Sequence, residues 1–232
     1  MARNSPSLSL MYKPVPWLTA YASYIEGLER GGVAPDEAAN AGDNQAPMLS
    51  RQRELGIKAE VGGVMLAGAL FEIEKAYEYT NASNVYVQSG RQNHRGLEFS
   101  ASGKPWDRLT LVGGATLLDT QVKGGDHDGN EPMNVAKVLV KLYSEYALLD
   151  VPGLILSAGV YHTGQQWADD ANTDRLPAYT TLDLGARYAT TLAGRALTLR
   201  LNLSNVADKR YWMNSYYVGP PRSLAVSAQM QF

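Results

Sequence analysis

Apolar and polar residues alternate along most of the chain, most clearly in the segment LTLRLNLSNVADKRYW at residues 197–212. Every second position at its start is leucine, and the positions between are polar. The leucines are Leu197, Leu199, Leu201 and Leu203, and the residues between and after them are Thr198, Arg200, Asn202 and Ser204. A period of two indicates a β-strand with one apolar and one polar face. No segment shows a convincing helical period, so we expect an all-β protein.

The alternation recurs in eleven segments, most of them long enough to cross a bilayer as a tilted strand, which takes about 9–11 residues. The predicted strands are residues 5–13, 17–26, 49–61, 64–79, 85–102, 107–122, 135–148, 153–164, 178–189, 195–205 and 222–232. Short turns alternate with mostly longer polar loops between these segments. Short turns at one rim and long loops at the other are typical of a transmembrane antiparallel β-barrel, here with about 10–11 strands.

The two faces of the predicted strands have different expected environments. We expect apolar side chains to contact lipid and charged ones to line the lumen, where charge costs little. Five carboxylates are therefore interpreted as lumen-wall residues rather than acid–base catalysts: Glu54, Glu60, Glu72, Glu74 and Glu98. Aromatic residues near strand ends predict interfacial girdles: Tyr12, Trp17, Tyr24, Tyr77, Tyr79, Tyr146, Tyr188 and Trp212. A soluble sheet shows the same alternation, so a soluble carbohydrate-binding β-sandwich stays open.

Composition narrows the function classes. The 232 residues include 21 Lys and Arg and 23 Asp and Glu, a formal net charge of −2, so no basic field favours nucleic acid. Cysteine is absent, which excludes disulfides and thiolate metal sites. The N-terminal residues do not read as a secretory signal. No nucleophile elbow, phosphate-binding loop or dinucleotide fingerprint is present, so we predict no enzyme activity and no cofactor.

Two acidic loops have a partial metal-binding pattern. Asp126, Asp128 and Asn130 have the spacing of a calcium loop, but Glu131 stands where that loop requires glycine. The acidic segment at residues 168–174 is likewise interpreted as a solvated loop. The three histidines, His94, His127 and His162, lack the spacing of metal ligands. We therefore predict no metal site.

The opening segment also carries a family resemblance. It resembles the closing motif of TonB-dependent outer-membrane receptors, in which a strand ending in Asn-x-x-Asp-x-x-Tyr precedes the last loop. The matching positions are Asn205, Asp208 and Tyr211, and a last-strand pattern follows with Gly219, Pro221 and Arg222 before an alternating run that ends at Phe232. Residues 21–60, 90–103 and 161–188 resemble the siderophore-receptor branch, in the family's order.

The resemblance implies that residues 1–232 correspond to the C-terminal half of a plugged barrel of about 22 strands. The plug domain, the segment that contacts TonB and the first barrel strands have no counterpart, so we expect this chain alone to be transport-incompetent. An odd number of strands cannot close with antiparallel pairing throughout. We therefore expect either an open, curved half-sheet or a ten-stranded closure that leaves out residues 5–13.

The implied function is a part in TonB-dependent uptake of ferric siderophores across the outer membrane of a Gram-negative bacterium. The implied partners are a ferric siderophore, outer-membrane lipid, the barrel-assembly machinery through the C-terminal strand, and TonB–ExbB–ExbD only through the missing plug region. Iron would belong to the transported chelate and would not be a cofactor. A structural or adhesive outer-membrane β-barrel is the alternative.

Aromatic and basic residues near the loop rim are the candidate ligand contacts. Flat aromatic surfaces suit hydrophobic metal chelates, and arginines attract anionic ones. The candidates are Tyr161, Trp167, Arg175, Arg210, Trp212, Tyr216 and Tyr217. A girdle or loop-packing role is the alternative for the aromatic residues among them.

Overall fold

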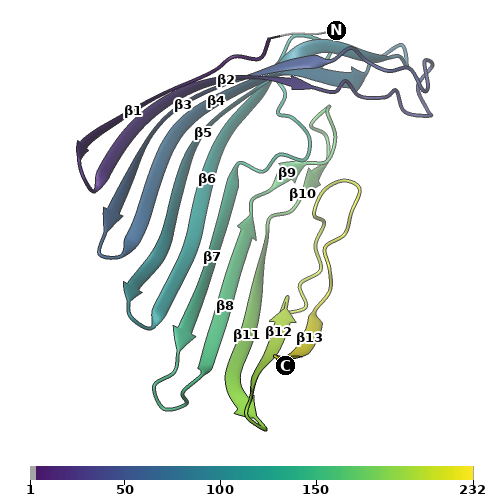
Figure 1. Cartoon of the computed structure of the whole chain (residues 1–232). Coiled ribbons are helices and arrows are strands. Elements are labelled where there is room, and N and C mark those ends of the chain that lie inside the picture. Colours follow the sequence, from purple (N-terminus) through teal and green to yellow (C-terminus); the bar gives the residue numbers. More distant parts are fainter. Residues whose placement is uncertain (1–3, 232) are drawn as a thin grey trace.

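The computed structural model describes residues 4–231, which form strands and loops. Eleven strands make one antiparallel sheet in which each strand pairs with its neighbours in chain order (Figure 1). They are β1 (Ser7–Val15), β2 (Leu18–Glu29), β3 (Met48–Val61), β4 (Val64–Thr80), β5 (Tyr86–Trp106), β6 (Leu109–Lys123), β7 (Val138–Ala147), β8 (Leu154–Thr163), β11 (Tyr179–Leu192), β12 (Arg195–Ser204) and β13 (Ser223–Met230). Within the described range, no helix is long and apolar enough to cross a membrane.

The sheet confirms the all-β prediction, and each predicted segment overlaps one of its strands. A separate hairpin of β9 (Gln166–Trp167) and β10 (Arg175–Leu176) was not predicted, because two-residue strands are too short to show a period. The curved sheet is open, since β1 and β13 each pair with one neighbour and not with each other. Of the two predicted arrangements, the open half-sheet is confirmed and the ten-stranded closure is wrong.

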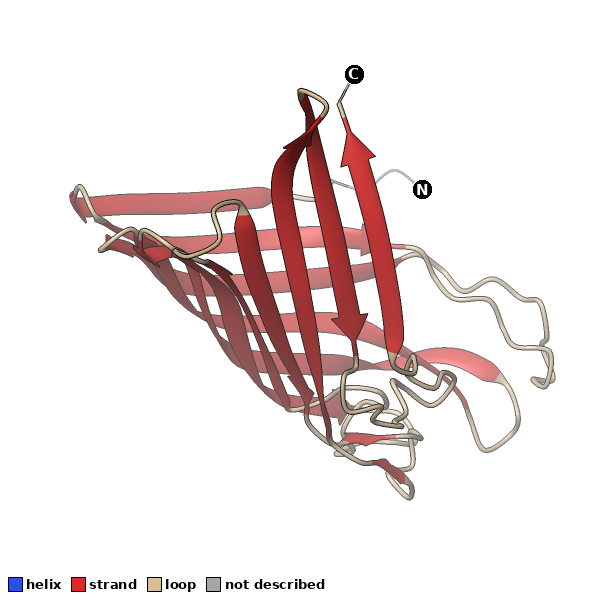
Figure 2. Cartoon of the chain, turned by 90° about the horizontal axis from the view of Figure 1, so that it is seen from below, coloured by secondary structure: helices blue, strands red, loops and turns tan. Residues whose placement is uncertain are grey.

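Short turns and long loops lie at opposite ends of the strands (Figure 2). Two of the two-residue turns join β3 to β4 and β11 to β12. Gly62 and Gly63 have φ of 56° and 75°, and Ala193 and Gly194 have φ of 51° and 76°. Two successive positive φ values are the signature of the two-residue turns that match strand twist. The predicted sorting of connections by length is therefore confirmed.

Strand length divides the sheet into two parts. β3 to β6 contain 14 to 21 residues, whereas β7, β8, β12 and β13 contain 8 to 10. A tilted strand crosses a bilayer in about 9–11 residues. The long strands therefore extend past any bilayer that the short strands span, and they do so on the side of the long loops.

Continuous register aligns apolar side chains into rows across the sheet. One such row, called the leucine row below, consists of Leu10, Ala22, Leu55, Leu70, Leu97 and Leu117. Leu55 and Leu70 are 59% and 54% exposed, because nothing in the described chain packs on this face. We call it the outer face, since a row of exposed leucines fits a lipid environment. The opposite face is the lumen face.

Two of the five carboxylates assigned to the lumen lie on the outer face instead. Glu72 and Glu74 follow Leu70 at even spacing on β4, and no bulge interrupts the strand before Ala76. They therefore point to the same side as Leu70, and the lumen assignment of these two residues is wrong. It failed because it treated the whole outer face as dry, whereas the upper parts of the long strands extend beyond the bilayer. Glu54 and Glu98 lie on the lumen face, as predicted.

The predicted aromatic girdle also needs a correction. Tyr12, Tyr146 and Tyr188 are exposed on the outer face, in agreement with it. Tyr77 and Tyr79 are instead nearly fully buried and stack on each other with ring centroids 4.9 Å apart. They form the one buried apolar cluster of the described residues with Val122, under the loops on the lumen face. The pattern could not show this, because the cover comes from a loop distant in sequence.

Candidate functional site

Three long loops contact one another at the long-loop end of the short strands. They are the β6–β7 loop (residues 124–137), the β8–β11 loop (residues 164–178, which includes β9 and β10) and the β12–β13 loop (residues 205–222). Their segments gather at one end of the molecule (Figure 2). We call these three loops the loop cluster.

Asn134 connects all three loops of the cluster. Its backbone N–H donates to the carbonyl of Trp167 at 2.8 Å. Its side-chain Oδ1 accepts from the backbone N–H of Ser215 at 2.8 Å and from the Ser215 hydroxyl at 2.7 Å. Asn134 has φ of 60°, a left-handed conformation that asparagine tolerates better than most residues. One residue of the β6–β7 loop thus fixes the positions of the other two loops.

Two further side chains reinforce the cluster. Gln166, 7% exposed, donates from Nε2 to the carbonyl of Met213 at 2.8 Å. Asn172, with φ of 57°, exchanges hydrogen bonds with the backbone of Glu131 at 2.8 and 2.9 Å. Buried or shared amide hydrogen bonds of this kind stabilise a loop by about 1 kcal/mol each. The cluster is therefore a cross-linked unit rather than three independent loops.

A separate loop covers the upper ends of β4 and β5. In the β2–β3 loop (residues 30–47), the N–H of Gly32 donates to the Glu78 carboxylate at 3.0 and 3.2 Å. Asn40 and Gln45 each donate a side-chain N–H to the carbonyl of Tyr86, at 3.0 and 3.1 Å. This loop is thus anchored to the long strands, apart from the loop cluster.

The cluster brings two of the predicted ligand contacts together. Trp167 on β9 and Arg175 on β10 are paired in register, and the Arg175 guanidinium carbon lies 4.0 Å from the Trp167 ring centroid. Such stacking holds a guanidinium in place while leaving its N–H donors free for an anion. The pair therefore has the chemistry that the sequence predicted for binding an anionic chelate.

Two other candidates lie at the tip of the β12–β13 loop. Tyr216 and Tyr217 are 69% and 65% exposed, and their backbone N–H groups donate to Oδ1 of Asn214 in a tight turn. Ser215, their neighbour, is the residue held by Asn134. The hydrogen bonds of Asn134 therefore link the position of these tyrosines to that of Trp167.

The remaining three candidate ligand contacts lie apart from the Trp167–Arg175 pair. Arg210 and Trp212 line a cavity of about 430 Å³ within the β12–β13 loop. Tyr161 lies on β8, where the register places it between Lys141 and Thr181 on the lumen face. It is thus a wall residue below the loops.

The family-motif residues form contacts at the two ends of the β12–β13 loop. Asn205 is 3% exposed, and its side chain donates to the carbonyls of Lys209 and Pro220 at 2.9 and 3.0 Å and accepts from the N–H of Lys209 at 2.9 Å. Asp208 accepts from the N–H of Arg222 at 3.0 Å. These bonds join the two ends of the β12–β13 loop.

Tyr211 packs at the base of the β12–β13 loop, where the two ends of the loop meet. Its ring stacks on Tyr179 at a centroid distance of 4.0 Å and lies where a Cβ on Gly219 would be, 2.1 Å from that position. Only glycine therefore fits at position 219. Pro221 lines the cavity beside the base, and Phe232 lies outside the described residues.

A polar cluster occupies the lumen face of the long strands. The Tyr21 hydroxyl donates to Glu54 at 2.5 Å, and Lys58 lies 5.2 Å from the centroid of the Tyr21 ring. Glu98 lines a small cavity together with Tyr21, Glu54 and Lys58. These groups present charge and hydrogen-bonding capacity to the lumen.

The sequence signalled some of this site and missed the rest. The aromatic and basic candidates were found by residue type. Asn134, Gln166 and Asn172 were not, because an amide in a polar loop has no distinguishing pattern until its distant partner is known. Within residues 4–231, no three His, Asp or Glu side chains gather at metal-binding distance. The absence of a metal site stays a prediction.

Comparison with known proteins identifies the class. The family described as TonB dependent receptor-like, beta-barrel, matches residues 2–206. The chain is 35% identical to the ferrichrome receptor FcuA of Yersinia enterocolitica, over 98% of this chain and 32% of that protein. It is 31% identical to the ferrioxamine receptor of the same organism, over 97% of this chain and 33% of that protein. The chain therefore spans about a third of these relatives.

A solved structure agrees with this match. The ferric preacinetobactin receptor BauA of Acinetobacter baumannii superimposes with a TM-score of 0.83 at 32% identity, over 98% of this chain and 36% of that one. The chain belongs to the TonB-dependent receptor β-barrel family, whose members here are siderophore receptors. These relatives are transport receptors rather than enzymes. Neither an adhesive barrel nor a carbohydrate-binding sandwich finds support among them.

Proposed function

We propose that this chain supplies wall strands and outer loops to a receptor for TonB-dependent uptake of ferric siderophores in a Gram-negative outer membrane. The observation that carries the proposal is the Trp167–Arg175 pair, held in a cross-linked loop cluster at the loop end of the sheet. An aromatic ring with a fixed guanidinium offers both apolar contact and charge to an anionic chelate. The names of the relatives support the same ligand class.

The proposal assigns different tasks to the two faces and ends of the sheet. The loops bind the chelate, and iron enters as part of it rather than as a cofactor. The lumen cluster around Glu54 holds a plug through polar contacts, and coupling to TonB–ExbB–ExbD goes through that plug. The outer face contacts lipid, and the barrel-assembly machinery recognises the last strand. The chain itself has no catalytic role.

The test uses the complete receptor that contains this chain, with ferrichrome and ferrioxamine as probes. A Trp167→Ala/Arg175→Ala double variant should bind its chelate about tenfold or more weakly, since it loses both the ring and the charge. Trp106→Ala is the matched control, because Trp106 is 69% exposed at the short-turn end. Titration calorimetry measures both. Unchanged affinity in the double variant, or an equal loss in the control, would contradict the proposal.

A further inference from the structure

A ladder of charged side chains crosses the outer face directly above the leucine row. Successive register pairs align Tyr24, Arg53, Glu72, Arg95 and Asp119 on β2 to β6. Glu72 lies between two arginines, 2.8 Å from Arg95 and 3.6 Å from Arg53. A second rung above it pairs Arg51 with Glu26 and Glu74, at 3.3 and 3.6 Å, and Arg91 of β5 joins this rung by reaching Glu74 at 3.0 Å. We call the two rungs together the arginine ladder.

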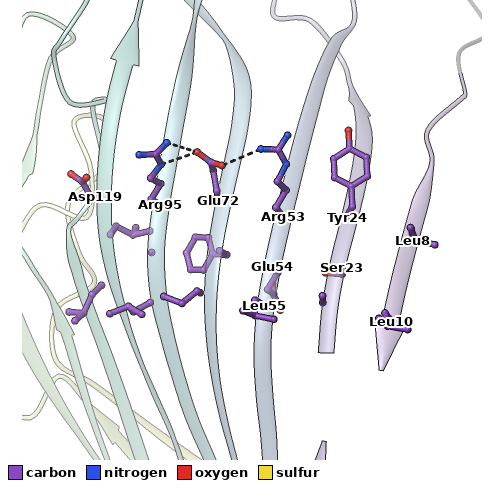
Figure 3. Close-up of a pocket in the computed structure, with 17 residues that line it drawn as sticks. Leu8, Leu10, Ser23, Tyr24, Arg53, Glu54, Leu55, Glu72, Arg95 and Asp119 are labelled. Carbon is purple, nitrogen blue, oxygen red and sulfur yellow. Dashed lines mark hydrogen bonds and ion pairs between the residues drawn. The ribbon is translucent and has the colours of Figure 1, made fainter. Parts of the chain in front are cut away.

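The first rung of the ladder and the leucine row line one open groove of about 1000 Å³. Figure 3 shows Arg53 and Arg95 on either side of Glu72 in one rung, with Leu55 and Leu10 in the rung below. Ser23 and Glu54, which lie between the two rows along β2 and β3, also border the groove. An apolar strip and a charged strip therefore lie side by side on a single surface.

The tips of the ladder are cationic although its net charge is balanced. The Arg53 and Arg95 side chains are 71% and 60% exposed, whereas that of Glu72 is 30% exposed. In the second rung, Arg91 is 62% exposed and its partner Glu74 is 37% exposed. Glu72 and Glu74 thus lie beneath the guanidinium groups and hold them in place, whereas Asp119, at the β6 end of the first rung, is exposed. Each guanidinium has five N–H donors, so donors stay free to face outward.

The depth of the ladder corresponds to a membrane boundary. Arg53 precedes Val61, the last residue of β3 at the short-turn end, by eight positions. A strand crosses a bilayer in about 9–11 residues, so Arg53 lies near the far boundary of the hydrocarbon. Charged side chains cost about 2–4 kcal/mol at the midplane of the lipid face and little at its edge. The ladder is therefore placed where lipid head groups meet the protein.

We propose that the arginine ladder binds the phosphate of an anionic lipid in the outer leaflet, with the lipid's acyl chains lying along the leucine row. Guanidinium groups bind phosphate through paired hydrogen bonds, and the two exposed arginines of one rung present such donors on either side of Glu72. The plug cannot be the occupant, because this surface faces away from the lumen. The inference rests on the membrane location in the proposed function and concerns a different surface from the chelate site.

The test uses the purified, delipidated receptor in detergent, titrated with dioleoyl phosphatidic acid or dioleoyl phosphatidylcholine and followed by native mass spectrometry. The wild type should bind phosphatidic acid about tenfold more tightly than phosphatidylcholine. Arg53→Gln/Arg95→Gln should abolish that preference. Added salt should weaken phosphatidic acid binding to the wild type, a measurement that needs no variant to fold. Excess inorganic phosphate distinguishes the sources, because a site for lipid should not be emptied by the free ion.

Arg187→Gln/Arg200→Gln is the matched control. Arg187 and Arg200 are register partners on β11 and β12, and Arg187 forms a similar half-exposed ion pair with Glu145 on the lumen face. This control should keep the lipid preference within about twofold. Three results would each overturn the proposal: equal affinity for both lipids, no loss in the ladder variant, or an equal loss in the control. A receptor that binds chelate but shows no lipid preference would leave the proposed function intact.

Discussion

The two parts of the sheet share the same alternating strand pattern but differ in what stabilises their long-loop ends. β3 to β6 are long, and the outer face of β2 to β6 changes from the leucine row to the arginine ladder along the strands. β7 to β13 are mostly short, and above them the loop cluster takes the place of extended strands. The long part thus ends in ion pairs between strands, and the short part ends in hydrogen bonds between loops. Exposed ion pairs are individually weak, so we expect the short part to be more sensitive to single substitutions.

The comparison predicts opposite responses to charge on the outer face. Leu201→Arg, on short β12, should destabilise the protein in lipid by about 2–4 kcal/mol, because the outer face of this strand lies within the bilayer. Gln121→Arg, on the outer face of long β6 at the level of the second ladder rung, should cost little. Asn202→Arg, next to Leu201 but on the lumen face, is the control for side-chain size. Urea unfolding in lipid vesicles measures all three. Equal costs at positions 201 and 121 would contradict the division.

How far the sequence predicts this fold depends on the range of the interaction. Period-two alternation predicts the eleven sheet strands because side-chain direction in a strand is a local property. It does not predict how far a strand extends past the membrane, which is why Glu72 and Glu74 were assigned to the wrong face. The loop cluster is less predictable still. Trp167 and Arg175 were selected by type, but their contact depends on a two-residue hairpin that has no periodic signal.

The next largest effect concerns the base of the β12–β13 loop. Asn205→Ala should destabilise the protein by about 2–3 kcal/mol, because it removes three side-chain hydrogen bonds and leaves the Lys209 and Pro220 carbonyls without their donor. It also places alanine at φ of 49°, which asparagine tolerates better. Asn214→Ala, in a half-buried turn at the tip of the same loop, should cost less, at about 1 kcal/mol. Thermal unfolding of the two variants compares them, and a similar shift in both would show that burial of Asn205 has no special effect.

A smaller effect should separate two asparagines of the loop cluster. Asn134→Ala should increase amide exchange in residues 212–218 by a local loss of about 1–2 kcal/mol, because it removes the acceptor for Ser215. Asn172→Ala is a matched control, since Asn172 has nearly the same φ and also joins two loops, but its side chain hydrogen-bonds to Glu131 and Asp169 rather than to Ser215. Its effect should be confined to residues 130–132 and 168–174. Increased exchange of residues 212–218 in both variants would mean that the cluster loosens as a whole.

The smallest expected effect is a pH dependence inside the β8–β11 loop. The Asp169 carboxylate accepts hydrogen bonds from the Thr173 hydroxyl and from the backbone N–H groups of Thr173 and Asp174, and these bonds lower its pKa. A lowered pKa means that the ionised carboxylate is stabilised in the folded loop. The contribution is therefore complete above the unfolded pKa of about 4 and is lost as the pH falls through the lower folded value. Amide exchange of residues 168–175, corrected for intrinsic rates, should differ between wild type and Asp169→Asn at neutral pH. The two should converge at about pH 3 or below, while residues of β5 should show no such convergence. A difference that persisted unchanged in acid would mean that the loop depends on the shape of Asp169 rather than on its charge.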